Sequence, residues 1–329
     1  MHLRASFPAA ALALAALAIP LPAGAQASGA SFTLSASPSY PAPYGQVTIS
    51  VLSTSLDLAN ATMAVSVGGK KVYTGNVRPA AVTLGAAGAL TAVTISITSG
   101  GATSVQTISF RPQDVALVAE PVSSAPPLYP GKPLVPLGGN ARVVAVANLK
   151  TAGGKAIDPA ALSYAWTVDG VQQGSSSGIG RNALIVASPL QYRDRLVSVT
   201  VQSQDGSITS GADLHLTAEA PTIRVYENDP LLGIRFDHAL ASAYAITGPE
   251  ASLYGAAYSF PTATGAPTLQ WFLNGAAAQT GPSITLRPTG AGTGTASLSL
   301  LASSGDATAN AALTVSFGAS AAGSNPFGL

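Results

Sequence analysis

The sequence predicts an all-β chain of three tandem β-sandwich domains, and a repeated motif carries this prediction. The pattern Trp-x-x-[Asp/Asn]-Gly occurs at Trp166 to Gly170 and again at Trp271 to Gly275, about a hundred residues apart, and no other tryptophan is present. A degenerate copy with Val65 in the tryptophan position lies about a hundred residues upstream. That period matches the length of one β-sandwich domain.

Residues 1–27 are expected to be a cleaved secretory signal peptide. A short basic start precedes an apolar stretch that ends at Pro20, and two Ala-x-Ala sites follow, which place cleavage before Gln26 or Ser28. An uncleaved N-terminal anchor is the alternative interpretation. No later window approaches eighteen uninterrupted apolar residues, so no integral membrane segment is expected after cleavage.

The first sandwich is placed at residues 28–120. Apolar and polar residues alternate around Leu34, Ile49 and Ile95, and a period of two is typical of half-buried strands. The glycine pairs Gly68-Gly69 and Gly100-Gly101 suit tight hairpins, because glycine adopts positive φ without strain.

The second and third sandwiches are placed at residues 121–219 and 220–317, and they repeat this order of strands and hairpins. The second opens with a proline-rich stretch, 121–136, which is interpreted as an N-terminal linker. Residues 318–329, rich in Ala, Gly and Ser, are predicted to form a flexible C-terminal tail.

The strand that carries each tryptophan resembles bacterial immunoglobulin-like and PKD-like modules. The resemblance rests on Tyr164-Ala165-Trp166-Thr167-Val168-Asp169-Gly170 and Leu269-Gln270-Trp271-Phe272-Leu273-Asn274-Gly275. It implies that Trp166 and Trp271 pack between two sheets, and that the chain serves adhesion, spacing or display outside the cytoplasm. The first unit departs from the pattern at Val65.

Composition excludes several classes of function. Only 9% of the residues are charged, and removal of Arg4 with the signal leaves 14 basic residues against 14 acidic ones, so nucleic acid is not an expected partner. Cysteine is absent, so each exported domain depends on its own core, which favours a bacterial or archaeal source. His215 and His238 are the only histidines after cleavage, and no catalytic motif is present, so no enzyme activity and no cofactor are expected.

Strand parity assigns Trp166, Trp271 and Val65 to the domain cores. Each tryptophan shares its parity with apolar neighbours, such as Tyr164 and Val168, so the side chains point to one buried face.

Two non-repeating segments are candidate binding sites. Glu227, Asp229 and Asp237 lie near the junction of the second and third units and offer carboxylates for Ca²⁺; a polar turn closed by Pro230 is the alternative. The apolar end of the tail, with Phe327 and Leu329, is a candidate for docking to a partner.

The predicted function is therefore an exported, non-enzymatic structural or interaction protein. It is expected to be secreted, periplasmic or at the cell surface, as a rod of sandwiches for adhesion, spacing or assembly with a protein partner. A glycan-binding module is the alternative, and it becomes the better prediction if four tyrosines converge on one exposed groove. These tyrosines are Tyr129, Tyr192, Tyr254 and Tyr258.

Overall fold

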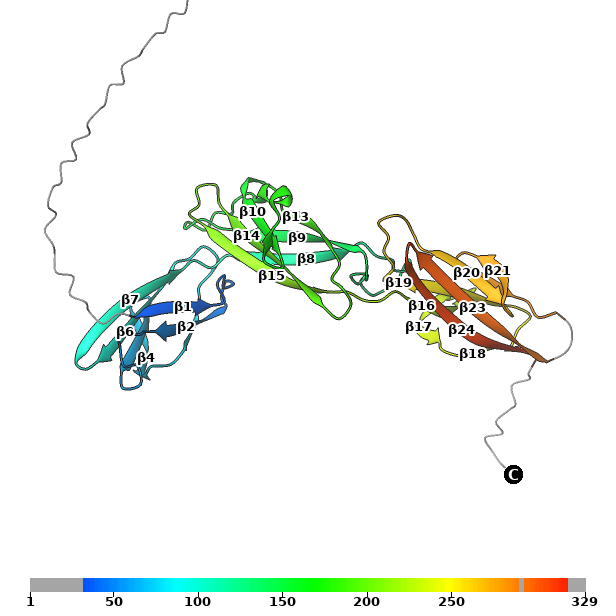
Figure 1. Cartoon of the computed structure of the whole chain (residues 1–329), viewed down its shortest axis with the longest axis horizontal. Coiled ribbons are helices and arrows are strands. Elements are labelled where there is room, and N and C mark those ends of the chain that lie inside the picture. Colours follow the sequence, from blue (N-terminus) through cyan, green and yellow to red (C-terminus); the bar gives the residue numbers. More distant parts are fainter. Residues whose placement is uncertain (1–31, 290–292, 319–329) are drawn as a thin grey trace, which may run out of the picture.

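The computed structural model describes residues 32–289 and 293–318, and in these ranges the chain forms three β-sandwiches in a row (Figure 1). The prediction of three tandem immunoglobulin-like sandwiches is confirmed. No α-helix occurs in the described ranges; η1 (Pro159–Ala161) and η2 (Gly174–Ser176) are short 3-10 turns. The predicted signal peptide lies outside the described residues.

The first sandwich packs a three-stranded sheet, in the order β1-β2-β5, on a four-stranded sheet, in the order β4-β3-β6-β7. All of its strand pairs are antiparallel. Its strands are β1 (Thr33–Ser37), β2 (Gln46–Leu52), β3 (Thr62–Val67), β4 (Lys70–Asn76), β5 (Ala80–Thr83), β6 (Thr91–Ser99) and β7 (Ala102–Phe110).

The second sandwich repeats this topology, with sheet orders β13-β9-β8 and β11-β10-β14-β15, and β12 paired with β10. Apart from β12, the strands of the second unit are linked in the same order as those of the first, which gives both units one immunoglobulin-like architecture. Its strands are β8 (Asp114–Pro121), β9 (Asn140–Asn148), β10 (Ser163–Val168), β11 (Val171–Gln172), β12 (Gly178–Ile179), β13 (Ala183–Ala187), β14 (Asp194–Gln202) and β15 (Thr209–Thr217).

The third sandwich adds strands to this plan. Its sheets have the orders β17-β16-β19-β22 and β18-β24-β23-β20-β21, and β18 runs parallel to β24. The additions are β17, which pairs with β16 at the edge of the first sheet, and β18, which pairs with β24 at the edge of the second. The strands are β16 (Thr222–Asp229), β17 (Gly233–Leu240), β18 (Ala243–Ile246), β19 (Ala251–Tyr258), β20 (Thr268–Leu273), β21 (Ala276–Thr280), β22 (Ser283–Leu286), β23 (Gly294–Ser304) and β24 (Ala307–Phe317).

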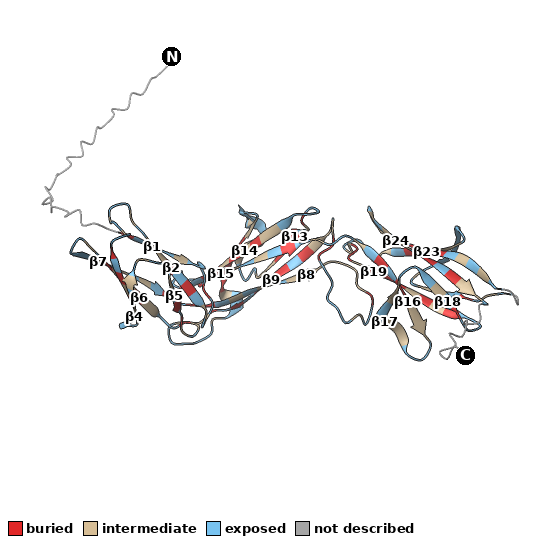
Figure 2. Ribbon diagram, turned by 90° about the horizontal axis from the view of Figure 1, so that it is seen from below, coloured by how far each residue is buried: buried red, intermediate tan, exposed pale blue. Residues whose placement is uncertain are grey.

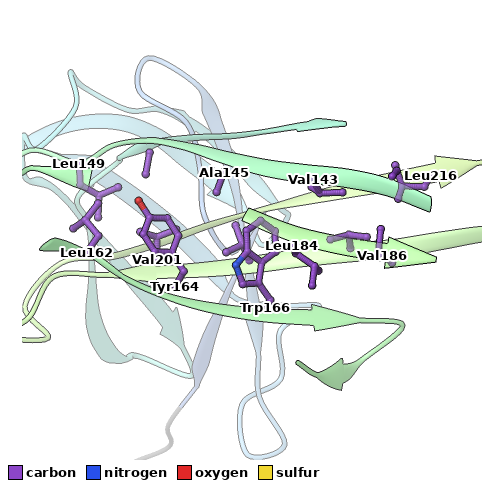
Figure 3. Packing of buried hydrophobic residues seen from close by; sticks show 14 of the residues in the cluster. Val143, Ala145, Leu149, Leu162, Tyr164, Trp166, Leu184, Val186, Val201 and Leu216 are labelled. Atoms are coloured by element: carbon purple, nitrogen blue, oxygen red, sulfur yellow. The ribbon is translucent and has the colours of Figure 1, made fainter. Parts of the chain in front are cut away.

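Each sandwich has its own buried core between its two sheets, as the burial colouring of Figure 2 shows. The side chains of Trp166, Trp271 and Val65 are all 0% exposed, and each lies in the core of a different sandwich. In the second sandwich, Trp166 and Tyr164 lie between the strands of the two sheets with the other core side chains (Figure 3). Burial of this apolar area is the main stabilising contribution to each unit.

The two tryptophans make the same hydrogen bond in their respective sandwiches. The indole N–H of Trp166 donates to the carbonyl oxygen of Arg181 at 2.8 Å, and that of Trp271 donates to the carbonyl oxygen of Gly281 at 3.0 Å. Each acceptor lies two residues before the next strand of the opposite sheet, β13 or β22. A buried tryptophan needs a partner for this donor, so the bond fixes one side-chain position in both units.

The turn after each tryptophan strand also has a repeated role. Asp169 and Asn274 both have φ of 50°, which these residue types tolerate better than most. The Oδ1 of Asp169 accepts from the backbone N–H of Leu196, and the Oδ1 of Asn274 accepts from that of Ser297, both at 2.9 Å. The motif therefore closes the hairpin and also ties it to the neighbouring strand, β14 or β23.

Asn274→Ala is expected to destabilise the third sandwich by about 1–2 kcal/mol, because alanine strains at positive φ and cannot accept from Ser297. Asn274→Asp keeps both properties and should stay within about 0.5 kcal/mol of the parent protein. Chemical denaturation of both variants measures the difference. Equal losses for the two variants would show that the side-chain hydrogen bond contributes nothing.

One domain boundary and one linker predicted from the sequence differ from the structure. The second sandwich begins at β8, whose residues Asp114 to Pro121 pair with β9, and not at residue 121. The proline-rich stretch at 121–136 is consequently not a linker in front of the second unit, because it connects β8 to β9 inside it. The alternation through Val115, Leu117 and Ala119 continues that of the first unit, so local pattern alone does not assign β8 to its partner.

Candidate functional site at the junction of the second and third sandwiches

The long connection between β8 and β9, Val122–Gly139, leaves the second sandwich and contacts the third; we call it the junction loop. Its 18 residues separate Pro121, the end of β8, from Asn140, the start of β9. Connections longer than about 12–15 residues without regular structure are uncommon in compact domains and usually serve a function. The contacts of this loop define the candidate site.

Ser124 joins the junction loop to the third sandwich through four hydrogen bonds. Its backbone N–H donates to the carbonyl of Phe260 at 2.9 Å, and its carbonyl accepts from the N–H of Ser259 at 3.1 Å. Its hydroxyl donates to the carbonyl of Ala257 and accepts from the N–H of Phe260. The N–H of Thr262 donates to the carbonyl of Val122, so the loop forms a short antiparallel pair with the segment that follows β19.

The far end of the junction loop is held by the chain that connects the two sandwiches. The N–H of Glu219 donates to the carbonyl of Val135 at 2.8 Å, and the N–H of Leu137 donates to the carbonyl of Glu219 at 2.9 Å. The loop is thus bonded to the connector and to the third sandwich at once. Backbone groups make five of these hydrogen bonds, and the Ser124 hydroxyl makes the other two.

The surface that receives the loop is the outer face of the sheet β17-β16-β19-β22. On β16, Ile223 and Val225 point into the core, so Arg224 and Tyr226 point outward. On β19, the core residue Leu253 alternates with Tyr254, and Tyr258 has the same parity as Tyr254. Register places Tyr254 opposite Tyr226, and Tyr258 opposite Thr222. Tyrosines of two strands therefore meet on one face.

An aromatic cluster forms on this face and includes a ring from the junction loop. The ring of Tyr129 lies edge-on to Tyr258 at 5.1 Å and to Phe236 at 5.9 Å between centroids. Phe236, on β17, also contacts Tyr226 at 5.2 Å and Tyr254 at 6.3 Å. Edge-to-face pairs at these separations stabilise by about 0.5–1.5 kcal/mol each beyond their buried area.

Gly131 makes room for the ring of Tyr129. A Cβ atom at position 131 would lie 2.2 Å from Cε1 of that ring. The glycine therefore allows the loop backbone to pass directly beside the ring. No feature of the sequence singles out this glycine, because its role depends on the position of a side chain two residues earlier.

A pocket of about 290 Å³ opens beside the cluster, between the junction loop and β16. The hydroxyls of Tyr226 and Tyr258 share a hydrogen bond of 2.9 Å at its wall. Burial raises the pKa of Tyr258, the bond with Tyr226 adds to this, and the positive charge of Arg224 acts in the opposite direction. The Tyr258 phenol is therefore a neutral hydrogen-bonding group at physiological pH. The polar and charged lining residues include Ser124, Lys132, Glu219, Arg224 and Ser259.

Three of the four tyrosines singled out in the sequence meet at this site. Tyr129, Tyr254 and Tyr258 belong to the cluster, whereas Tyr192 is 95% exposed in the connection between β13 and β14 of the second sandwich. Ser124 and Phe236 also belong to the site, and neither was predicted from the sequence. A signal for the rest of the site was present in the sequence. Along β16 and β19, period-two alternation places four side chains on the sheet face that does not carry the core residues: Arg224, Tyr226, Tyr254 and Tyr258.

The calcium candidate consists of Glu227, Asp229 and Asp237, whose carboxylates each have another partner in the structure. Among the described residues, no group of three or more His, Asp or Glu side chains is placed to hold a metal ion. The segment is the β16–β17 hairpin, and each carboxylate has another partner: Glu227 accepts from the hydroxyl of Tyr244.

The other two carboxylates serve the hairpin itself. The Oδ1 of Asp229 accepts from the N–H groups of Leu232 and Leu231, which lower the pKa of Asp229. The hydrogen bond from Arg235 lowers the pKa of Asp237. The polar turn is thus the interpretation that these contacts support.

The remaining candidates are placed as follows. Phe327 and Leu329, the proposed docking residues, lie outside the described residues.

At the junction of the first and second sandwiches, the side chain of Gln113 is buried. Its amide N–H donates to the carbonyl of Lys150, and its amide oxygen accepts from the N–H of Lys150. Gly88 of the first sandwich lies against the backbone of Thr151 and Lys150. The described ranges contain no helix of the length and apolar character that a membrane span requires.

Comparison with known proteins gives similar folds among solved structures. No family model and no curated protein matches the chain. The structure of immunoglobulin domains 1–5 of Sidekick-1 is 12% identical with a TM-score of 0.30, over 84% of this chain and 56% of that one.

Two further structures match over most of their own length. The three N-terminal domains of the outer capsid protein Hoc of bacteriophage RB49 are 12% identical with a TM-score of 0.23, over 88% of this chain and 98% of that one. The central fibronectin-III array of RIM-binding protein is 12% identical with a TM-score of 0.29, over 86% and 95%. At such low identity the likeness concerns tandem β-sandwich architecture alone.

Proposed function

We propose that the protein is an exported, non-enzymatic rod of immunoglobulin-like sandwiches that spaces or presents an interaction surface for adhesion or for assembly with a protein partner. Its place is outside the cytoplasm, secreted, periplasmic or at the cell surface. The observation that supports this most strongly is the attachment of the junction loop to the third sandwich through Ser124. A spacer must resist bending between its units, whereas independent domains on a plain linker move freely.

The rigidity of this junction can be measured in the full-length mature chain. Because cysteine is absent, pairs of introduced cysteines accept spin labels without competing sites. Labels at the exposed positions Gln172 and Ala278 report the second junction, and we expect a narrow distance distribution by double electron–electron resonance. Combining Ser124→Ala with Tyr129→Ala should broaden it, because two hydrogen bonds and two ring contacts are lost.

A second label pair provides the matched control. Labels at Lys71 and Gln172, both exposed, span the first junction, and the same double variant should leave that distribution unchanged. A broad distribution across the second junction in the parent protein would contradict the rigid rod. So would a double variant with an unaltered distribution.

Export and partnership need a cellular test. Fractionation of the native host, followed by crosslinking in whole cells and recovery of the protein, should place it outside the cytoplasm and identify a protein bound to it. Recovery from the cytosol alone would refute the exported role.

Glycan binding is a second candidate function, and one observation favours it. Tyr129, Tyr254 and Tyr258 converge at the second junction beside a pocket with polar walls. Aromatic rings with convergent polar groups are typical of small-ligand sites between domains. Because Tyr192 lies elsewhere, the convergence is incomplete, and the rod remains the leading proposal.

A further inference from the structure

We propose that the pocket at the second junction binds an acidic sugar, with the sugar ring against Tyr129 and Tyr258 and its carboxylate at Arg224 and Lys132. This inference rests on glycan binding, the second candidate function, and adds the chemical class of ligand. It would give the rod a ligand site composed of two sandwiches, so that neither unit alone presents it.

The aromatic side of the pocket comes from both sandwiches. Tyr129 belongs to the junction loop, and Tyr258 to β19 of the third sandwich, and both rings line the pocket while only half-buried. Part of each ring is therefore open to a ligand. The ring positions are fixed in advance, because Tyr129 packs edge-on against Tyr258 and Phe236, and the Tyr258 hydroxyl is bonded to Tyr226. Such preorganisation lowers the entropic cost of binding.

The positive side of the pocket consists of Arg224 and Lys132. Both are exposed, and neither makes an ion pair with a carboxylate within the described ranges. The two side chains come from different sandwiches, Lys132 from the junction loop and Arg224 from β16. Against the one carboxylate of the lining, Glu219, these two cations give the pocket a net positive charge in a chain with only 15 Lys and Arg residues. Guanidinium and ammonium groups are the usual protein partners of a carboxylate.

The other polar groups of the pocket and its volume also fit a sugar. Glu219 and Ser259 line the same pocket, and the carboxylate oxygens of Glu219 can accept hydrogen bonds. A ligand with one carboxylate and several hydroxyls satisfies these groups together, which a purely apolar or purely anionic ligand does not. The volume of about 290 Å³ lies at the small end of the range for ligand pockets, which fits a single sugar unit.

The test uses the full-length mature protein and two matched probes, an oligomer of galacturonic acid and its methyl ester, with binding followed by isothermal titration calorimetry. We expect the acid to bind and the ester to bind about tenfold or more weakly, since esterification removes the charge. Arg224→Gln should weaken binding of the acid by a similar factor and leave binding of the ester nearly unchanged. Because Arg224 is exposed, this variant retains the fold.

Lys155→Gln is the control, because it removes the same charge at an exposed position that does not line the pocket. It should leave binding of the acid unchanged. Equal binding of acid and ester would overturn the acidic specificity while glycan binding stands. An unaltered affinity in Arg224→Gln would overturn the placement of the site. Absence of binding by either probe at millimolar concentration would overturn both this inference and glycan binding; the rod is judged separately, by the spin-label distances.

Discussion

Trp271→Ala is expected to lower the free energy of unfolding of the third sandwich by about 3–5 kcal/mol. The side chain is 0% exposed and central to its core, so its removal leaves a cavity between the two sheets. The carbonyl of Gly281 also loses its indole donor. Trp271→Phe should cost less, about 1–3 kcal/mol, because a ring still fills part of the space.

Hydrogen exchange read by mass spectrometry measures this effect domain by domain, which matters because three sandwiches need not unfold together. In Trp271→Ala, the amides of β23 should lose protection while those of β14 keep theirs. The control is Tyr192→Ala, whose side chain is 95% exposed and whose loss should leave both strands unchanged. Unaltered protection of β23 in Trp271→Ala would show that the tryptophan is not central to the core.

Gly255→Val is expected to destabilise the third sandwich by about 3 kcal/mol, at the upper end of the usual cost of overpacking. Gly255 lies on β19, and a Cβ atom there would lie 2.2 Å from Cδ2 of Leu300 and 3.2 Å from Cζ2 of Trp271. Both neighbours are fully buried, so neither has free space into which to move. The glycine thus makes room for the large indole on the opposite sheet.

Chemical denaturation followed by the fluorescence of Trp271, in a Trp166→Phe background, measures this loss in the third sandwich. The matched control is Gly248→Val, in the same sandwich, where the nearest atom to a Cβ is the carbonyl oxygen of Glu250 at 3.6 Å and the position is exposed. That variant should change the free energy of unfolding by less than about 0.5 kcal/mol. Equal losses in the two variants would contradict the packing argument.

Much of the fold follows from local patterns. The all-β class and the core positions of Trp166 and Trp271 depend on period-two alternation and on turn residues, and both are properties of neighbouring residues. The turns at Asp169 and Asn274 could also be predicted from the sequence, since few residue types adopt positive φ. What these residues bond across the sheet, Leu196 and Ser297, required the strand pairing.

The candidate site was much less predictable. Ser124 lies in a proline-rich stretch typical of linkers, yet its partners Ala257 and Phe260 are more than a hundred residues away. The tyrosines could be singled out in the sequence as candidate ligand-binding residues. Their convergence, however, depends on the register between β16 and β19 and on the path of the junction loop. In the β16–β17 hairpin, closeness in sequence suggested a shared calcium site. In the structure the three carboxylates instead bond to three separate partners.

The sequence by itself determined the number of sandwiches, the centre of each core and the closure of its hairpins, because alternation and turn conformation act over a few residues. Only the tertiary structure decided that β8 belongs to the second sandwich and that the junction loop binds the third. Those features arise from hydrogen bonds between distant segments. Ser124, Tyr129 and Gly131 of the junction loop follow no periodic pattern in the sequence. Each of them acts through a neighbour that folding brings beside it.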